Sequence, residues 1–111
     1  MTFHGVDTAK QFKHMRELVP DAFRAFLDFN GKAFADGALP AKTKELMALA
    51  IAQITQCPWC IDAHSKNSIK AGASDAEIAE TTFVAMAMAA GAAWSHGGLA
   101  LQCTEAHRAK S

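Results

Sequence analysis

The sequence predicts an all-helical fold in one domain of five to six helices spanning residues 1–111. Val, Ile and Thr are sparse and do not alternate with polar residues, so no segment shows the two-residue period of a half-buried strand. A length of 111 residues corresponds to about one domain. With 50% hydrophobic and 20% charged residues, the composition is that of a folded globular protein.

Two helices are expected in the N-terminal third of the chain. The first covers residues 8–18, with Asp7 or Thr8 as its cap, because short polar side chains favour the N-cap position. Pro20 fits the first turn of the second helix, where its missing N–H would have no partner anyway. Gly37 is the expected stop signal of this second helix.

A helical hairpin is expected next. Its first helix opens at Leu39-Pro40 and runs to about Gln56, with apolar residues at helical spacing. These apolar residues are Leu46, Met47, Ala50, Ile51 and Ile54. The second helix begins at Pro58, again at the first helical position, and ends at Gly72.

The last third of the chain is predicted to be helical with one break. Ser74 and Glu77 match the capping-box pattern, which places the start of a helix near Asp75. Gly91 is expected to separate this helix from a last one over residues 92–103. The polar tail, residues 104–111, is expected to be frayed.

The segment AMAMAAGAAW, residues 85–94, has almost no polar face. A helix that is apolar on all sides requires burial on all sides, and a chain of this size offers few places for it. Small residues also allow helices to approach closely. The segment therefore predicts a homo-oligomer, with a tightly packed monomer core as the alternative.

Charge and hydropathy argue against several classes of partner. The formal net charge is +0 and no basic stripe is visible, so neither nucleic acid nor an anionic membrane has electrostatic support. The longest apolar stretch, residues 83–94, is shorter than the roughly 20 residues of a membrane span. The N-terminus lacks the apolar run of a signal peptide. We expect a soluble cytoplasmic protein, in which close cysteine pairs tend to be redox-active or metal-binding.

The motif that carries chemistry is Cys57-Pro58-Trp59-Cys60, with His64 four residues further on. In a helix that starts at Pro58, positions 57, 60 and 64 share one face, because they differ by three and four residues. This spacing lets the two sulfurs meet and places the imidazole beside Cys60. Helix N-termini and nearby basic groups lower the pKa of a thiol, and the thiolate is the reactive form. The motif predicts a redox-active dithiol.

Glu45 is the second element of this candidate site. It borders the apolar face of the helix that precedes the motif. If the two helices pack as a hairpin, Glu45 lies about three turns before the turn that carries Cys57. Its carboxylate can then point at the face formed by the cysteines and His64, where a partly desolvated carboxylate suits proton transfer.

Taken together, Glu45, eleven intervening residues, CPWC, three residues and His64 resemble the E-x11-C-x-x-C-x3-H signature of alkylhydroperoxidase D-like proteins. These proteins belong to the carboxymuconolactone decarboxylase superfamily. The flanking segments LPAKTKELMALAIA and AHSKNSIKAGASDAEIAE also resemble the core of that family, so the resemblance covers about residues 39–90.

The resemblance implies an all-α fold assembled into trimers or hexamers. It also implies peroxidase-type or peroxiredoxin-reducing activity, with no cofactor beyond a redox-active disulfide between Cys57 and Cys60. Glu45 and His64 then form the proton relay. The implied partners are a peroxide and a dithiol reductant of lipoyl or thioredoxin-like type. In one departure, Trp59 stands where some members have a histidine before the second cysteine.

Three further residues complete the expectations for the site. Trp59 is expected to be a packing residue or a pocket wall. His96 is expected to line the pocket from a neighbouring helix or subunit, and Cys103 to be a spectator. The order of attack is left open, because the adjacency of His64 favours Cys60, whereas the N-cap position favours Cys57.

Two other functions are compatible with the same residues. The superfamily includes a lactone decarboxylase, whose acid–base chemistry does not need the cysteine pair. A zinc-binding or redox-sensing helical module would instead use Cys57, Cys60 and His64 as ligands, with Cys103 or His96 as the fourth. We expect no metal, because Pro58 and Trp59 at the start of a helix favour a dithiol.

Overall fold

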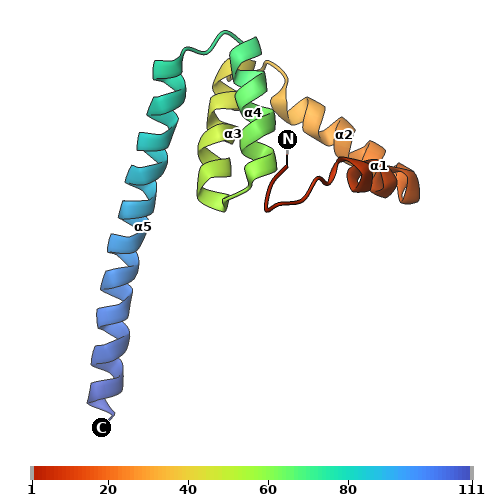
Figure 1. The fold of residues 1–111 in the computed structure, drawn as a ribbon. Helices are drawn as coiled ribbons and strands as arrows, with labels where there is room; N and C mark the ends of the chain where they lie inside the picture. Colours follow the sequence, from red (N-terminus) through yellow and green to blue (C-terminus); the bar gives the residue numbers. More distant parts are fainter. Residues whose placement is uncertain (1, 111) are drawn as a thin grey trace.

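The computed structural model describes residues 2–110, which form five helices joined by short connections (Figure 1). The helices are α1 (Ala9–Leu18), α2 (Pro20–Phe34), α3 (Ala41–Thr55), α4 (Pro58–Lys70) and α5 (Asp75–Ala109). Residues 2–110 contain no strand, and an isolated bridge pairs Phe3 with Val6 in a tight turn. The all-α fold in a single domain is therefore confirmed.

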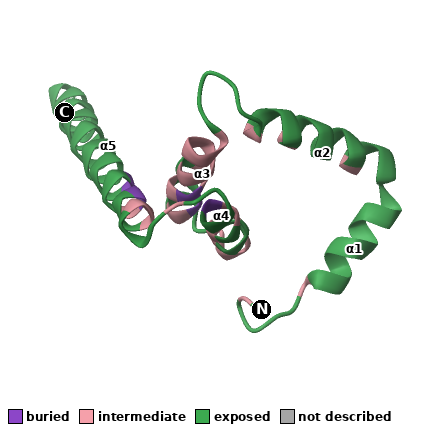
Figure 2. Ribbon diagram, turned by 90° about the horizontal axis from the view of Figure 1, so that it is seen from above, coloured by how far each residue is buried: buried purple, intermediate pink, exposed green. Residues whose placement is uncertain are grey.

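The centre of the fold is the hairpin of α3 and α4, and α5 packs against α3. Buried side chains lie where these three helices meet, and α1 and α2 form an arm whose side chains are mostly exposed (Figure 2). The most buried residues are Leu49 and Ala52 of α3, Ser68 of α4, and Thr81 and Ala85 of α5. Helix α3 thus supports both of its neighbours and fixes the position at which α4 begins.

The ends of α1 and α2 differ in detail from the expectation. Asp7 Oδ1 accepts the N–H of Ala9 at 3.1 Å, whereas the hydroxyl of Thr8 caps nothing. Helix α2 ends at Phe34, three residues before Gly37, because the chain turns there to cap the next helix. In that turn Asp36 Oδ1 accepts the N–H of Ala41 at 2.7 Å.

The connection from α4 to α5 follows the predicted signals. Gly72 has a φ of 90°, which suits glycine, and the N–H of Ala73 bonds to the carbonyl of Ser68 at 2.9 Å. The capping box is complete, because Ser74 Oγ accepts the N–H of Glu77 and Glu77 Oε1 accepts the N–H of Ser74.

Two predictions for the last third of the chain are wrong. Helix α5 is continuous from Asp75 to Ala109, so Gly91 does not divide it and residues 104–109 are not frayed. One glycine costs a helix interior only about 1 kcal/mol relative to alanine, and the neighbouring alanines and methionines compensate for it. Arg108 in the last turn also favours the helical end, since a cation there complements the helix dipole.

Helix α5 is also long and apolar enough to cross a membrane, judged by length and composition alone. Its most apolar 18-residue window has a mean hydropathy of 1.2, and only 6% of that window is buried. The apolar stretch is therefore longer than expected, because the helix does not break at Gly91. A single helix of this kind is weak evidence for a membrane span.

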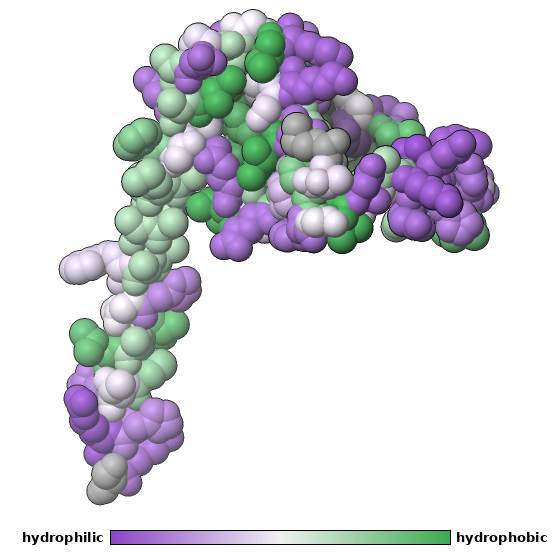
Figure 3. Space-filling view, viewed as in Figure 1, coloured by the Kyte–Doolittle hydropathy of each residue, from purple (hydrophilic) through white to green (hydrophobic). Residues whose placement is uncertain are grey.

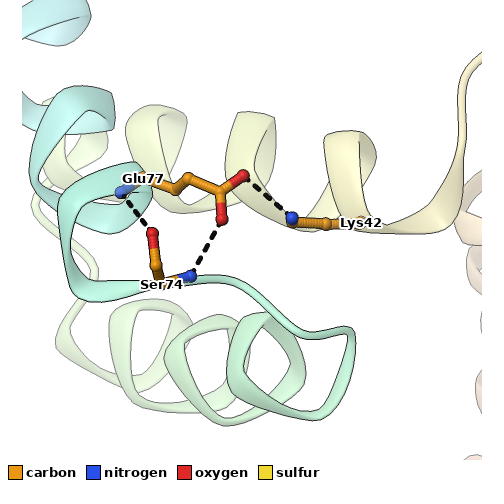
Figure 4. Close-up of polar contacts among 3 residues, drawn as sticks. All are labelled: Lys42, Ser74 and Glu77. Atoms are coloured by element: carbon orange, nitrogen blue, oxygen red, sulfur yellow. Dashed lines mark hydrogen bonds and ion pairs between the residues drawn. The ribbon is translucent and has the colours of Figure 1, made fainter.

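A polar clamp ties the start of α5 to the start of α3. Lys42 Nζ lies 2.8 Å from Glu77 Oε2, while the other oxygen of Glu77 serves the capping box (Figure 4). The Lys42 ammonium, and next the backbone N–H of Ser74, lower the pKa of the Glu77 carboxyl below its ordinary value of 4.5. A depressed carboxyl pKa adds stability that is present above the ordinary pKa and is lost as the pH falls through the folded-state pKa.

The clamp gives a pH-dependent prediction. Glu77→Gln keeps a capping-box residue at this position but removes the titrating group. The loss of Tm on going from about pH 7 to about pH 3 should be smaller in Glu77→Gln than in the wild type. Thermal unfolding followed by circular dichroism measures the Tm of the wild type and of Glu77→Gln at each pH. The matched control is Glu80→Gln, at an exposed position one turn further along α5. An equal acid-induced loss of Tm in the wild type and Glu77→Gln would contradict the prediction.

Candidate redox site

A tight reversal places Cys57 at the start of α4. Helix α3 ends at Thr55, and Gln56 adopts the left-handed conformation with φ 57° and ψ 46°. The N–H of Cys57 then bonds to the carbonyl of Ala52 at 3.1 Å. Cys57 is therefore the N-cap of α4, and Pro58 takes the first helical position as predicted.

Cys57 and Cys60 form a disulfide across the first turn of α4, with their Cα atoms 5.3 Å apart. The N–H of Cys60 donates to Cys57 Sγ at 3.3 Å, so the first cysteine acts as a sulfur cap of the helix. Cys57 is half-buried and Cys60 is exposed. The positive end of the helix dipole and an accessible sulfur thus coincide.

The carboxylate of Glu45 and the imidazole of His64 form a direct pair, with Oε2 and Nδ1 2.7 Å apart. The α3–α4 hairpin brings them together across 19 residues of sequence. Both are largely shielded, because their side chains are 12% and 21% exposed. His64 lies one helical turn beyond Cys60, so the pair borders the disulfide. The expected meeting of Glu45 and His64 is confirmed, and their role stays a prediction.

Phe34 is a component that sequence reasoning did not assign to the site. Its ring stacks on the imidazole of His64, with centroids 5.0 Å apart and planes inclined by 19°. Phe34 is the last residue of α2, so the arm reaches the site through this contact. Its place on the apolar side of α2 was visible in the sequence, but the contact with His64 was not.

Trp59, between the two cysteines, anchors the N-terminal segment. Its Nε1–H donates to Thr8 Oγ1 at 3.0 Å. The turn in which Phe3 and Val6 exchange backbone hydrogen bonds brings the rings of Phe3 and His4 to 5.6 and 5.5 Å from the Trp59 ring. Trp59 is thus a packing residue here, and the N-terminal segment covers one side of the motif.

We expect Thr8→Val to loosen this segment. The substitution keeps the shape but removes the acceptor of the indole N–H, which costs roughly 1 kcal/mol. Amides in residues 3–12 should then exchange about fivefold faster, as measured by hydrogen exchange with mass spectrometry. Thr104→Val, at an exposed threonine of α5, is the matched control. Unchanged exchange in residues 3–12 would show that the hydrogen bond does not hold the segment.

His96 and Cys103 lie outside the site of a single chain. Both are exposed residues of the second half of α5. Nothing places His96 at the pocket from a neighbouring helix of the same chain, since α5 packs on α3 and His96 lies in its exposed half. A contribution from a neighbouring subunit stays a prediction.

The arrangement joins a dithiol–disulfide pair to an acid–base pair. When the Glu45 carboxylate is ionised it only accepts hydrogen bonds, so in that state the 2.7 Å contact has the hydrogen on Nδ1 of His64 and leaves Nε2 to act as a base. Within residues 2–110, no three or more His, Cys, Asp and Glu side chains are gathered in a way that could hold a metal ion. The described residues thus offer sulfur redox and proton transfer as their chemistry.

The helical hairpin and this site define a class of small all-α proteins with a CxxC motif, a glutamate and a histidine. The model of the carboxymuconolactone decarboxylase family matches residues 20–102, which is wider than the 39–90 expected from the motifs. The chain belongs to the carboxymuconolactone decarboxylase family.

Several relatives agree with this assignment. An uncharacterised protein of the cox locus of Paracoccus denitrificans is 49% identical over 77 residues, covering 69% of each chain. The crystal structure of a carboxymuconolactone decarboxylase family protein from Legionella pneumophila, in its apo form, matches with a TM-score of 0.70 and 39% identity, covering 74% of this chain and 73% of that one. An alkyl hydroperoxide reductase of Mycobacterium tuberculosis is 42% identical over 43 residues, which are 39% of this chain and 12% of that protein.

Proposed function

We propose that this protein is a thiol-dependent peroxidase that reduces a peroxide with Cys57 and Cys60 and uses Glu45 and His64 as its proton relay. The observation that carries the proposal is the disulfide at the start of α4, one turn from the Glu45–His64 pair. The similarity to the mycobacterial alkyl hydroperoxide reductase over 43 residues supports the same activity.

The first step consumes the peroxide. His64 Nε2 takes the proton of the attacking thiol, and the thiolate attacks one oxygen of the peroxide, so that the O–O bond breaks. The sulfur becomes a sulfenic acid, and the leaving oxygen takes the proton and departs as an alcohol or as water. Glu45 stabilises the imidazolium that exists between these two proton transfers.

The second and third steps restore the dithiol. The other cysteine attacks the sulfenic sulfur, which forms the disulfide and releases water. An external dithiol, of lipoyl or thioredoxin-like chemistry, then exchanges with the disulfide through a mixed disulfide. The external pair is oxidised as Cys57 and Cys60 are reduced, and no further cofactor takes part.

Cys60 is the cysteine we assign to the attack on peroxide. It is exposed, whereas Cys57 is half-buried, and it is the helical neighbour of His64. Cys57, whose sulfur lies within reach of the N–H of Cys60, is the resolving residue in this scheme.

Thiol counting tests the proposal directly. The reduced chain has three cysteines, so one equivalent of hydrogen peroxide or cumene hydroperoxide should lower the titratable thiols from three to one, with Cys103 remaining. A dithiol should restore all three, and repeated cycles should consume stoichiometric peroxide. A reduced protein that keeps three titratable thiols under peroxide would refute the proposed function.

A decarboxylase of the carboxymuconolactone type is the second candidate, favoured by the acid–base pair of Glu45 and His64. Such chemistry does not need the sulfurs. Turnover of carboxymuconolactone by protein whose thiols have been alkylated would therefore support this alternative over the peroxidase. For either activity we propose a soluble protein of the cytoplasm.

A further inference from the structure

A single chain exposes far more surface than a folded protein of its mass. Its accessible surface is 8579 Å², whereas a compact monomer of 11.8 kDa exposes about 5,900 Å². Its radius of gyration is 19.3 Å, against about 13 Å for a compact chain of this length. The excess, about 2,700 Å², has the size of an obligate subunit interface. We therefore expect another protein surface to cover this area.

Helix α5 carries more of the uncovered large apolar side chains than any other helix, with seven of the twenty that are exposed in residues 2–110. Ala85 is the last buried residue of this helix, and residues 86–109 are all exposed. They form about 36 Å of helix on which no residue is buried, and Met88 near its start borders α3. Figure 3 shows this half of α5 projecting from the molecule, with many apolar residues along it and hydrophilic residues at its end. Trp94 is 85% exposed on it.

An apolar groove lies beside the other half of α5. It runs between α3 and α5, with a volume of about 570 Å³, and its walls include Met47, Ile51, Ile54, Val84 and Met88. Each chain therefore carries both an unpartnered apolar helix and a groove that could receive one.

One face of α5 has the spacing of a helix-pairing seam. Val84, Met88, Gly91, Ser95 and Gly98 recur at intervals of four and three residues, so they lie in one row. The row is bulky on the half that borders the groove and small on the projecting half. If a second copy of the helix runs antiparallel, the bulky residues of each copy face the small residues of the other, which is the requirement for interlocking packing.

Charge supports the same orientation. The first turn of α5 contains Asp75 and Glu77, and its last turn contains Arg108. An antiparallel pair that crosses near Gly91, at the middle of the helix, brings the acidic end of each copy to the basic end of the other. The opposed helix dipoles also favour this arrangement.

We infer that two copies of this chain pair through antiparallel α5 helices that cross at Gly91, and that the projecting half of each α5 lies in the α3–α5 groove of the other. Around the crossing, Met88 of each copy is opposite Ser95 of its partner. The occupant of the groove is a second copy and not lipid, because the seam and the terminal charges are self-complementary. A six-chain assembly would contain three such pairs.

The first test substitutes the crossing point. A Cβ added at Gly91 or at Gly31 meets nothing within 4 Å in the single chain. Leucine also favours the helix over glycine, so neither change should harm an isolated chain. We expect multi-angle light scattering to give an even number of chains for the wild type and for Gly31→Leu, and a shift to single chains for Gly91→Leu. A monomeric or three-chain wild type, or a Gly91→Leu variant of unchanged mass, would overturn the inference.

The second test fixes the register by cross-linking in a Cys103→Ser background. Met88→Cys with Ser95→Cys should give a covalent dimer on oxidation, whereas either substitution alone should not. The single variants cannot bridge in the antiparallel pair, because their two copies lie about 10 Å apart along the axis. A covalent dimer from a single variant indicates a parallel pair and would overturn the proposed orientation.

The same preparation also tests whether α5 binds a membrane instead of a second copy of the chain. The proposed pair is soluble without detergent and does not float with phosphatidylcholine vesicles, and the emission of Trp94 in a Trp59→Phe variant is blue-shifted and protected from acrylamide. Flotation with the vesicles, or a Trp94 that is quenched as fast as free tryptophan, would overturn the inference. Neither result bears on the peroxidase proposal, which thiol counting tests separately.

Discussion

A Cys60→Ser variant is expected to lose peroxide turnover by on the order of 10³-fold or more, because it lacks the sulfur that we assign to the attack on the O–O bond. A Cys57→Ser variant should also fail to turn over, but for a different reason. Its Cys60 can still attack the peroxide once and form a sulfenic acid, which then has no thiol in the same motif to resolve it. The two variants should therefore differ in their first turnover.

The measurement is single-turnover trapping of the sulfenic acid with dimedone, followed by mass spectrometry of the α4 peptide. The adduct should appear on Cys60 of the Cys57→Ser variant and should be absent from Cys60→Ser. Cys103→Ser is the matched control, because it removes an exposed thiol away from the motif and should leave turnover unchanged. An adduct found only on Cys57 would reverse the roles of the two sulfurs, and full turnover in either motif variant would refute the mechanism.

The parts of the site that could be predicted from the sequence are those determined by residues that lie close together in the chain. Pro58 and the CxxC spacing are sufficient to place the two sulfurs on the first turn of a helix, because proline at the first position and the helical repeat act over a few residues. The capping box of Ser74 and Glu77 is predictable for the same reason. The Glu45–His64 contact required one further step, the assumption that two consecutive helices form a hairpin.

The parts that could not be predicted depend on contacts between distant segments. Thr8 is a plausible cap by propensity, but its hydroxyl bonds to Trp59, which lies 51 residues away. The stack of Phe34 on His64 likewise depends on how the arm folds back, and nothing local in α2 specifies that path. The periodicity of a helix shows which side is apolar but not which ring it meets.

The continuity of α5 shows a further reason why a local signal in the sequence can fail to predict the structure. Gly91 is a valid break signal in the sequence, but a break forms only when the packing on either side favours a change of direction. Beyond Ala85 no residue of the helix is buried against the rest of the chain, so no close packing redirects it. The small residues around Gly91 also suit a site where two helices cross. Their presence in the sequence therefore does not by itself require a break in the helix.

The Glu45–His64 pair should determine the rate of the reaction and its dependence on pH. At 2.7 Å from Oε2, Nδ1 of His64 is held as the hydrogen-bearing nitrogen, which leaves Nε2 free to accept the thiol proton. A glutamine at position 45 can turn its amide N–H towards Nδ1 and favour the opposite tautomer, in which Nε2 carries the hydrogen and cannot act as the base. The substitution changes the shape of the side chain very little, so its effect is on the proton and not on packing.

Glu45→Gln is accordingly expected to lower kcat/KM for the peroxide by about 10²-fold near neutral pH, in the range that general acid–base catalysis contributes. The deficit should shrink towards high pH, where hydroxide deprotonates the thiol without help from His64. Asp62→Asn makes the same chemical change at an exposed position of α4 and should keep the wild-type rate at every pH. Stopped-flow peroxide consumption between about pH 5 and pH 9 compares the three proteins. A uniform loss of rate across this range in Glu45→Gln would indicate a structural role for Glu45, and an unchanged rate would remove it from the relay.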